Sequence, residues 1–362
     1  MSAEQVNAGT PFQLSKMIQK MMIILPIGLL INLAFALGGS DRDVWMKLTN
    51  FSPGYFALAI LMVMLPWFAN TLRLFIWTRF LGTKLTFLQT FRIILISEFG
   101  AAITPSAVGS APVKTALLIQ EKMTSGAALS LATITTFEDL AFFVVAIPTA
   151  LTLSAAWHLP FLGSFYDRLH ANLIWFAASI LMLCIIIWLT IAVFPKFKTR
   201  KINAPANHSL SFMQRIKSKG KNVLIEFKSA CMLIAKRGKR RFMATSILTG
   251  FQWICRYSVI TALVASLGLA ADPVLFFVLQ WLVFTLSVFI PTPGASGGAE
   301  ASFYLIFAPF LPHRSLGLLT TGWRFLVFYL FLGIGVLVYF LLYLVETVMK
   351  KTFHEPELIL AE

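Results

Sequence analysis

The stretch "PTPGASGG", from Pro291 to Gly298, interrupts an apolar region that runs from about residue 274 to residue 311. Proline lacks the backbone N–H that a helix needs, and glycine favours other conformations, so a helix cannot continue through this stretch. The apolar arms on either side are short for a membrane crossing of about 20 residues. We therefore predict a re-entrant helical hairpin here, with two complete crossings as the alternative.

A similar interruption lies earlier in the chain, so we call it the first break and Pro291–Gly298 the second break. The stretch "TPSAVGSAP", from Thr104 to Pro112, breaks an apolar region between about residues 85 and 123. Aligned without gaps, residues 104–111 match residues 292–299 at Thr, Pro, Ala, Gly and Ala. Polar backbone at membrane depth must be covered by protein or line a wet cavity, so we expect both breaks to be buried or to border a cavity.

Long apolar segments flank the two breaks. With 58% hydrophobic and 12% charged residues, the composition is that of a membrane protein rather than a soluble domain. The segments lack the alternation typical of a barrel, so the predicted fold class is all-α, a single polytopic membrane helix bundle over residues 1–362. We predict six crossings, near residues 17–38, 54–78, 126–156, 172–194, 243–267 and 317–347.

The order of these segments predicts an inverted repeat. One half covers about residues 54–156 and the other about residues 243–347, with a hairpin at the same position in each half. The crossings that flank the two hairpins are expected to run in opposite directions. In transporters this arrangement is typical of a site near the middle of the membrane.

The segment between the halves is strongly basic. The net charge is +15, and 14 of the 30 Lys and Arg residues lie between Lys196 and Arg241, where Glu226 is the only acid. The positive-inside rule places this loop, residues 195–242, in the cytoplasm together with both termini. We expect a multi-pass protein of a bacterial inner membrane whose basic loop faces anionic headgroups rather than nucleic acid, and we leave a homo-oligomer open.

Ionisable residues inside the apolar segments are candidates for a site, because an unpaired charge in a membrane is costly. They are Arg92, Glu98, Lys114, Glu138, Asp139, Arg256, Glu300 and Arg324. The candidates within the breaks are Thr104, Gly109, Thr292, Gly294, Gly297 and Gly298. For Glu138 and Asp139, a role in helix packing is as well supported as a role in a site.

Together these residues predict a binding site for a phosphate. The helices that resume near Lys114 and Glu300 direct positive dipole ends toward the breaks. Lys114 and Arg324 would bind the phosphate, while Glu98 and Glu300 would act as gates, proton carriers or ion-pair partners. We expect Lys114→Ala and Arg324→Ala to abolish lipid-dependent activity without affecting folding.

No metal or other cofactor is expected. Three cysteines, Cys184, Cys231 and Cys255, and five scattered histidines lack metal-ligand spacing. The triplet Asp41-Arg42-Asp43 matches a metal-binding motif of glycosyltransferases, but no nucleotide-binding domain accompanies it, so we interpret it as a solvated loop.

The segment "FIPTPGASGGAEASFYLIF", residues 289–307, is similar to the Pro-x-Pro-Gly-Gly-x-Gly-x-x-Glu signature of the lysylphosphatidylglycerol synthase/flippase transmembrane region family. The similarity extends to "RLFIWTRFLG", "TTFEDLAFFV" and "WRFLVFYLFLGIG", which begin at residues 73, 135 and 323. The chain departs from the family pattern at Gly109-Ser110, in place of Gly-Glu, and at Glu138-Asp139, in place of Glu-Arg. It also ends shortly after the last crossing, without the soluble aminoacyltransferase domain, so aminoacyl transfer is not expected.

The resemblance and the residues favour a flippase-like transporter that binds or translocates an anionic, phosphate-bearing membrane lipid. The alternative is a membrane-embedded transferase that acts on a polyprenyl-phosphate or phospholipid substrate, with a carboxylate such as Glu300 as base. A third possibility is a secondary carrier of a small soluble anion, which would need an opening that admits only water-soluble molecules.

Overall fold

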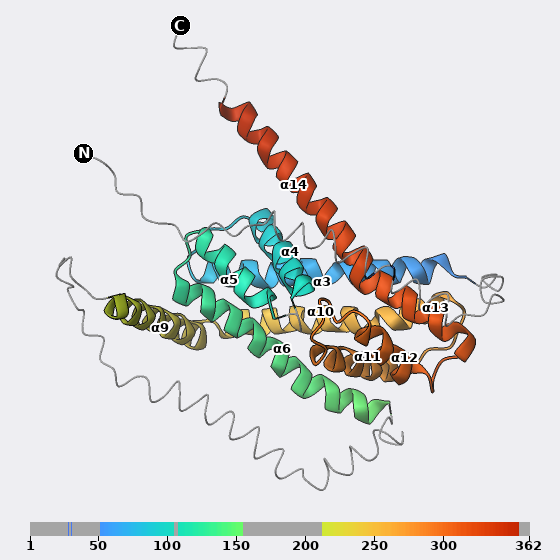
Figure 1. The fold of residues 1–362 in the computed structure, drawn as a ribbon. Coiled ribbons are helices and arrows are strands. Elements are labelled where there is room, and N and C mark those ends of the chain that lie inside the picture. Colours follow the sequence, from blue (N-terminus) through green and yellow to red (C-terminus); the bar gives the residue numbers. More distant parts are fainter. Residues whose placement is uncertain (1–27, 29, 31–50, 105–107, 155–211, 355–362) are drawn as a thin grey trace, which may run out of the picture.

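The computed structural model describes residues 28, 30, 51–104, 108–154 and 212–354, and the regular elements in these residues are helices (Figure 1). The predicted all-α class is confirmed. Four helical segments are long and apolar enough to cross a membrane: α3 (Pro53–Phe80), α6 (Ser125–Leu153), α10 (Lys239–Ser266) and the continuous segment His313–Leu341. They correspond to four of the six predicted crossings.

The other two predicted crossings, 17–38 and 172–194, lie outside the described residues except for helical residues 28 and 30. Gly28 packs closely against the last crossing. A Cβ atom at this position would lie 2.6 Å from the Tyr329 hydroxyl oxygen, so no larger residue fits without a shift.

The last crossing contains an irregular turn. It consists of α13 (His313–Arg324), the π-helix η4 (Phe325–Leu330) and α14 (Phe331–His354). Such π-helical turns are rare and often mark functional positions. Here the turn directly follows Arg324.

Short helices form the arms of the two predicted hairpins. They are α4 (Phe87–Ile103) and α5 (Ser110–Gln120) in the first half, and α11 (Pro273–Val288) and α12 (Gly298–Phe307) in the second. Asp272 caps the start of α11 by accepting hydrogen bonds from the N–H groups of Val274 and Leu275. The breaks thus lie where they were predicted, while the choice between re-entrant and crossing arms stays a prediction.

The two halves share an order of helix lengths. The first four helices have 28, 17, 11 and 29 residues, and the second half begins with helices of 28, 16 and 10 residues. Helices α3 and α10 pack antiparallel, because Ser52 N–H donates to Ser266 O at 2.8 Å and Arg73, further along α3, donates to Gln252 at 3.1 Å. These features support the inverted repeat, which stays a prediction.

A threonine side chain satisfies backbone groups at each break. In the first break, Thr104 Oγ1 accepts from Gly109 N–H at 2.9 Å and donates to Gly100 O at 2.8 Å. In the second, Thr292 Oγ1 donates to Ser296 O at 3.1 Å. Both threonines therefore replace backbone hydrogen bonds that the interrupted helices lose.

The basic segment contains a helix where a loop was predicted. Helix α9 (Phe212–Arg237) fills much of residues 195–242 and is separated from α10 only by Gly238. Its residues 223, 227, 230 and 234 recur at helical spacing and face α6, and Ala230 and Ile234 are buried. This helix was not expected, because the count of basic residues obscured the apolar period, and the cytoplasmic position of the segment stays a prediction.

Candidate functional site

A cavity of about 450 Å³ lies between the two halves. Its walls come from α3, α4, α6, α10, α11, the second break and the last crossing. Most lining side chains are apolar or aromatic, and the charged ones are Glu98, Arg256 and Arg324. A largely apolar pocket of this size with a few convergent polar groups is typical of a ligand site.

An ion pair within this cavity joins the two halves. Arg256, on α10, lies with Nη2 3.6 Å from Oε2 of Glu98, on α4, and the two side chains are 26% and 20% exposed. The guanidinium also lies 5.4 Å from the ring centroid of Trp253. The 3.6 Å between Arg256 Nη2 and Glu98 Oε2 exceeds hydrogen-bond distance. The Arg256 guanidinium therefore keeps N–H donors that a bound anion can use.

A second ion pair is buried beside the cavity. Arg324 Nε lies 2.9 Å from Glu300 Oε1, and the Glu300 side chain is fully buried. The other Glu300 oxygen accepts from Gly297 N–H at 2.7 Å, and Arg324 donates to the Gly294 carbonyl. The Glu300–Arg324 pair therefore fixes the geometry of the second break. The N–H of Gly297 already has a hydrogen-bond partner in Glu300.

The glycines of the second break have different physical roles. Gly294 and Gly297 adopt φ values of +60° and +83°, which favour glycine. A Cβ atom at Gly294 would lie 2.3 Å from the Phe328 ring, and one at Gly298 would lie 2.3 Å from Ile290, whereas Gly297 faces open space. Gly294 is therefore constrained by both its backbone and its neighbour.

We expect Gly294→Ala to destabilise the protein more than Gly297→Ala does. Both substitutions place an alanine at a positive φ that residues with a Cβ atom rarely adopt, but only the first also displaces Phe328. Thermal unfolding in detergent measures the difference, with Gly333→Ala, at a helical site with open space, as control. Equal losses from the two substitutions would contradict this interpretation.

Some predicted site residues lie away from the cavity wall. Lys114 is half-buried on α5 and does not line the cavity. Gly109 packs against Gly100, and Arg92 lies with its guanidinium 5.7 Å from the centroid of the Tyr339 ring. The cavity thus brings together Glu98, Arg256, Arg324 and Gly294.

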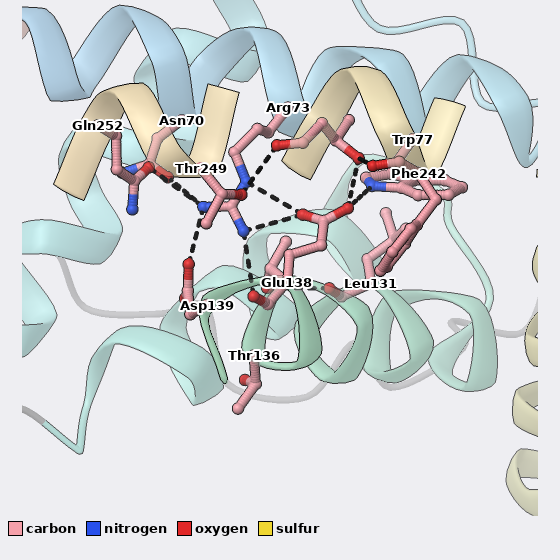
Figure 2. A network of polar contacts seen from close by, with 12 residues as sticks. Asn70, Arg73, Trp77, Leu131, Thr136, Glu138, Asp139, Phe242, Thr249 and Gln252 are labelled. Carbon is pink, nitrogen blue, oxygen red and sulfur yellow. Dashed lines mark hydrogen bonds and ion pairs between the residues drawn. The ribbon is translucent and has the colours of Figure 1, made fainter. Parts of the chain in front are cut away.

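Glu138 belongs to a separate buried network centred on Arg73 of α3 (Figure 2). Arg73 contacts one Glu138 oxygen at 2.9 and 3.1 Å, and Trp77 Nε1 donates to the other at 2.9 Å. The remaining partners of Arg73 are Asn70, Thr135 O, Gln252 and Asp139, at 3.0–3.2 Å. Thr245, on α10, also donates to Glu138.

This network holds α3, α6 and α10 together, so the packing role left open for Glu138 and Asp139 has direct geometric support. It also reaches the cavity wall, because Asp139 accepts from Trp253 Nε1 at 3.0 Å and Trp253 lines the cavity.

Arg73 was missed among the candidates, although it is an ionisable residue inside a predicted crossing and met the criterion applied to the others.

A family model described as "Lysylphosphatidylglycerol synthase TM region" matches residues 22–335. The chain belongs to this family. The lysylphosphatidylglycerol synthase TM region thus covers the first half, most of the second half, both breaks and the cavity. The predicted resemblance to this family is confirmed.

One relative of this chain is a protein from Archaeoglobus fulgidus described as "UPF0104 membrane protein". It is 22% identical over 272 residues, which cover 75% of this chain and 81% of the relative. The family and the apolar helices make this chain a multi-pass membrane protein.

Proposed function

We propose that the protein binds an anionic, phosphate-bearing membrane lipid and moves it between leaflets, with the headgroup in the cavity between the halves. The observation that carries this proposal is a guanidinium, Arg256, that lines the cavity and is only loosely paired with Glu98 at 3.6 Å. Guanidinium groups bind phosphate oxygens through charge-assisted hydrogen bonds. A phosphate would therefore compete with Glu98 for Arg256.

The cavity wall also suits a lipid rather than a small soluble anion. Its surface is mainly apolar and aromatic, so it offers a small soluble anion few partners beyond the three charged side chains. Acyl chains attached to the headgroup would extend along apolar helices. This supports the lipid over the soluble anion.

The transferase alternative has less support. Glu300, its expected base, is fully buried, paired with Arg324 and hydrogen-bonded to Gly297. A carboxylate in this position cannot approach a substrate without breaking both contacts. Its arrangement supports a structural role in the second break.

The proposal includes a bacterial inner membrane with both termini in the cytoplasm. The basic segment between Lys196 and Arg241 supports this orientation. Rocking of the two halves around the Glu98–Arg256 contact would expose the cavity to each leaflet in turn.

Proteoliposomes that contain fluorescent phosphatidylglycerol test the proposal, with external dithionite reporting the movement of labelled headgroups. We expect Arg256→Ala to reduce the protein-dependent rate by about tenfold or more, because a hydrogen bond to a charged group contributes about 1.5–3 kcal/mol. The matched control is Arg79→Ala, at an exposed position on α3. Movement equal to that in empty liposomes across a panel of anionic lipids would contradict the function.

A further inference from the structure

Helix α9 has one face that is already occupied. This face packs on the start of α6, where a Cβ atom at Gly126 would lie 2.3 Å from Cβ of Glu226 and 2.4 Å from the backbone nitrogen of Phe227. Ala230 and Ile234 are buried along the same face. The contact holds α9 firmly against a membrane-spanning helix.

The remaining surface of α9 combines exposed apolar and basic side chains. The exposed apolar residues are Leu224, Ile225, Met232 and Leu233, and Leu224 is 58% exposed. The exposed basic residues at the junction with α10 are Lys236, Arg237, Lys239, Arg240 and Arg241. Apolar side chains among Lys and Arg are typical of helices that lie in a membrane interface.

The sequence from residue 196 to residue 271 contains one acidic side chain, and the structure turns it toward α6. Glu226 is the only acid between residues 196 and 271, and its Oε2 atom accepts from Gly126 N–H of α6 at 3.1 Å. The one negative charge is therefore directed toward the protein. The other charged side chains of this segment are positive and complementary to anionic lipid headgroups.

The position of α9 brings this surface close to the membrane. Only Gly238 separates it from α10, which is long and apolar enough to cross the bilayer. In Figure 1, α9 lies at the end of the molecule where α6 and α10 begin, and it is seen partly along its axis while α10 is seen from the side. Helix α9 is therefore inclined to α10 at the end of the molecule where the crossings α6 and α10 begin.

We infer that α9 docks on the anionic cytoplasmic surface of the membrane, with the headgroups of acidic phospholipids as its partner. The apolar side chains enter the interface, and the Lys and Arg side chains bind the headgroups. This docking is separate from the cavity and does not depend on the proposed transport.

Site-directed spin labelling of the full-length protein tests this inference. A nitroxide is attached in turn at positions 224 and 232 of a chain whose native cysteines are replaced, and the protein is placed in nanodiscs of phosphatidylcholine alone or with 30% phosphatidylglycerol. Accessibility to oxygen and to a water-soluble nickel chelate reports whether each label lies in lipid or in water. We expect both labels to move from water into lipid when phosphatidylglycerol is present.

A charge variant provides the matched comparison. Lys236→Gln/Arg237→Gln/Arg240→Gln removes three exposed cations and is expected to weaken partition onto the anionic surface by about two orders of magnitude, so its labels should stay in water. Labels that show the same accessibility in both membranes would overturn the inference. If the labels lie in water in both kinds of nanodisc, the exposed face of α9 binds a protein partner instead of the membrane. If they lie in lipid in both, anionic headgroups are not what α9 recognises.

Discussion

We expect Arg324→Ala to abolish lipid movement and also to destabilise the protein. Arg324 is the partner of the buried Glu300 carboxylate, at 2.9 Å, and it donates to the carbonyl of Gly294 in the second break. Removing one partner of a buried pair leaves an uncompensated charge and typically costs about 3–5 kcal/mol. The dithionite assay and detergent unfolding measure the two effects on the same preparation.

A double variant separates the two effects. In Arg324→Ala/Glu300→Gln the uncompensated charge is gone, and the amide oxygen still accepts from Gly297 N–H. We expect stability to recover largely while transport stays lost, because the cavity still lacks the Arg324 guanidinium. Recovery of transport together with stability would show that Arg324 acts only through the fold. The structure thus changes the earlier expectation that Arg324→Ala leaves folding intact.

We expect Arg73→Ala to produce the other large loss of stability. Arg73 neutralises Glu138 in the interior, so its removal leaves that carboxylate with only the donors of Trp77 and Thr245. The expected cost is about 3–5 kcal/mol in the free energy of unfolding. Titration with denaturing detergent, followed by tryptophan fluorescence, measures it.

The control for this prediction is Arg79→Ala. Arg79 lies on the same helix, but it is exposed. Its guanidinium carbon lies 4.5 Å from the centroid of the Phe75 ring. We expect removal of the Arg79 side chain to lower the free energy of unfolding by about 1 kcal/mol or less. If the two alanine variants unfold alike, the Arg73–Glu138 network does not stabilise the bundle.

The long apolar crossings and the two breaks could be predicted from the sequence because their physical causes are local. A span such as α3 needs only enough apolar residues to cross the bilayer, and a break such as Pro291–Gly298 follows from residues that cannot continue a helix. The π-helix η4 has no such local signal, since the residues Phe325–Leu330 are ordinary helix formers in a membrane.

The site could be predicted only in part. The criterion of intramembrane charge found Glu98, Arg256 and Arg324, which line the cavity. It could not tell which carboxylate pairs with which cation, because Glu98 meets Arg256 across the halves whereas Glu300 meets Arg324 within one half. Those pairings depend on helix packing between segments far apart in the sequence.

The central claim is that the cavity between the halves holds the phosphate of an anionic lipid. Its most direct test is an experimental structure of the protein in nanodiscs that contain phosphatidylglycerol. We predict headgroup density in the cavity, with a phosphate within hydrogen-bond distance of Arg256. Headgroup density confined to the membrane surface, with Arg256 still paired to Glu98, would contradict the claim.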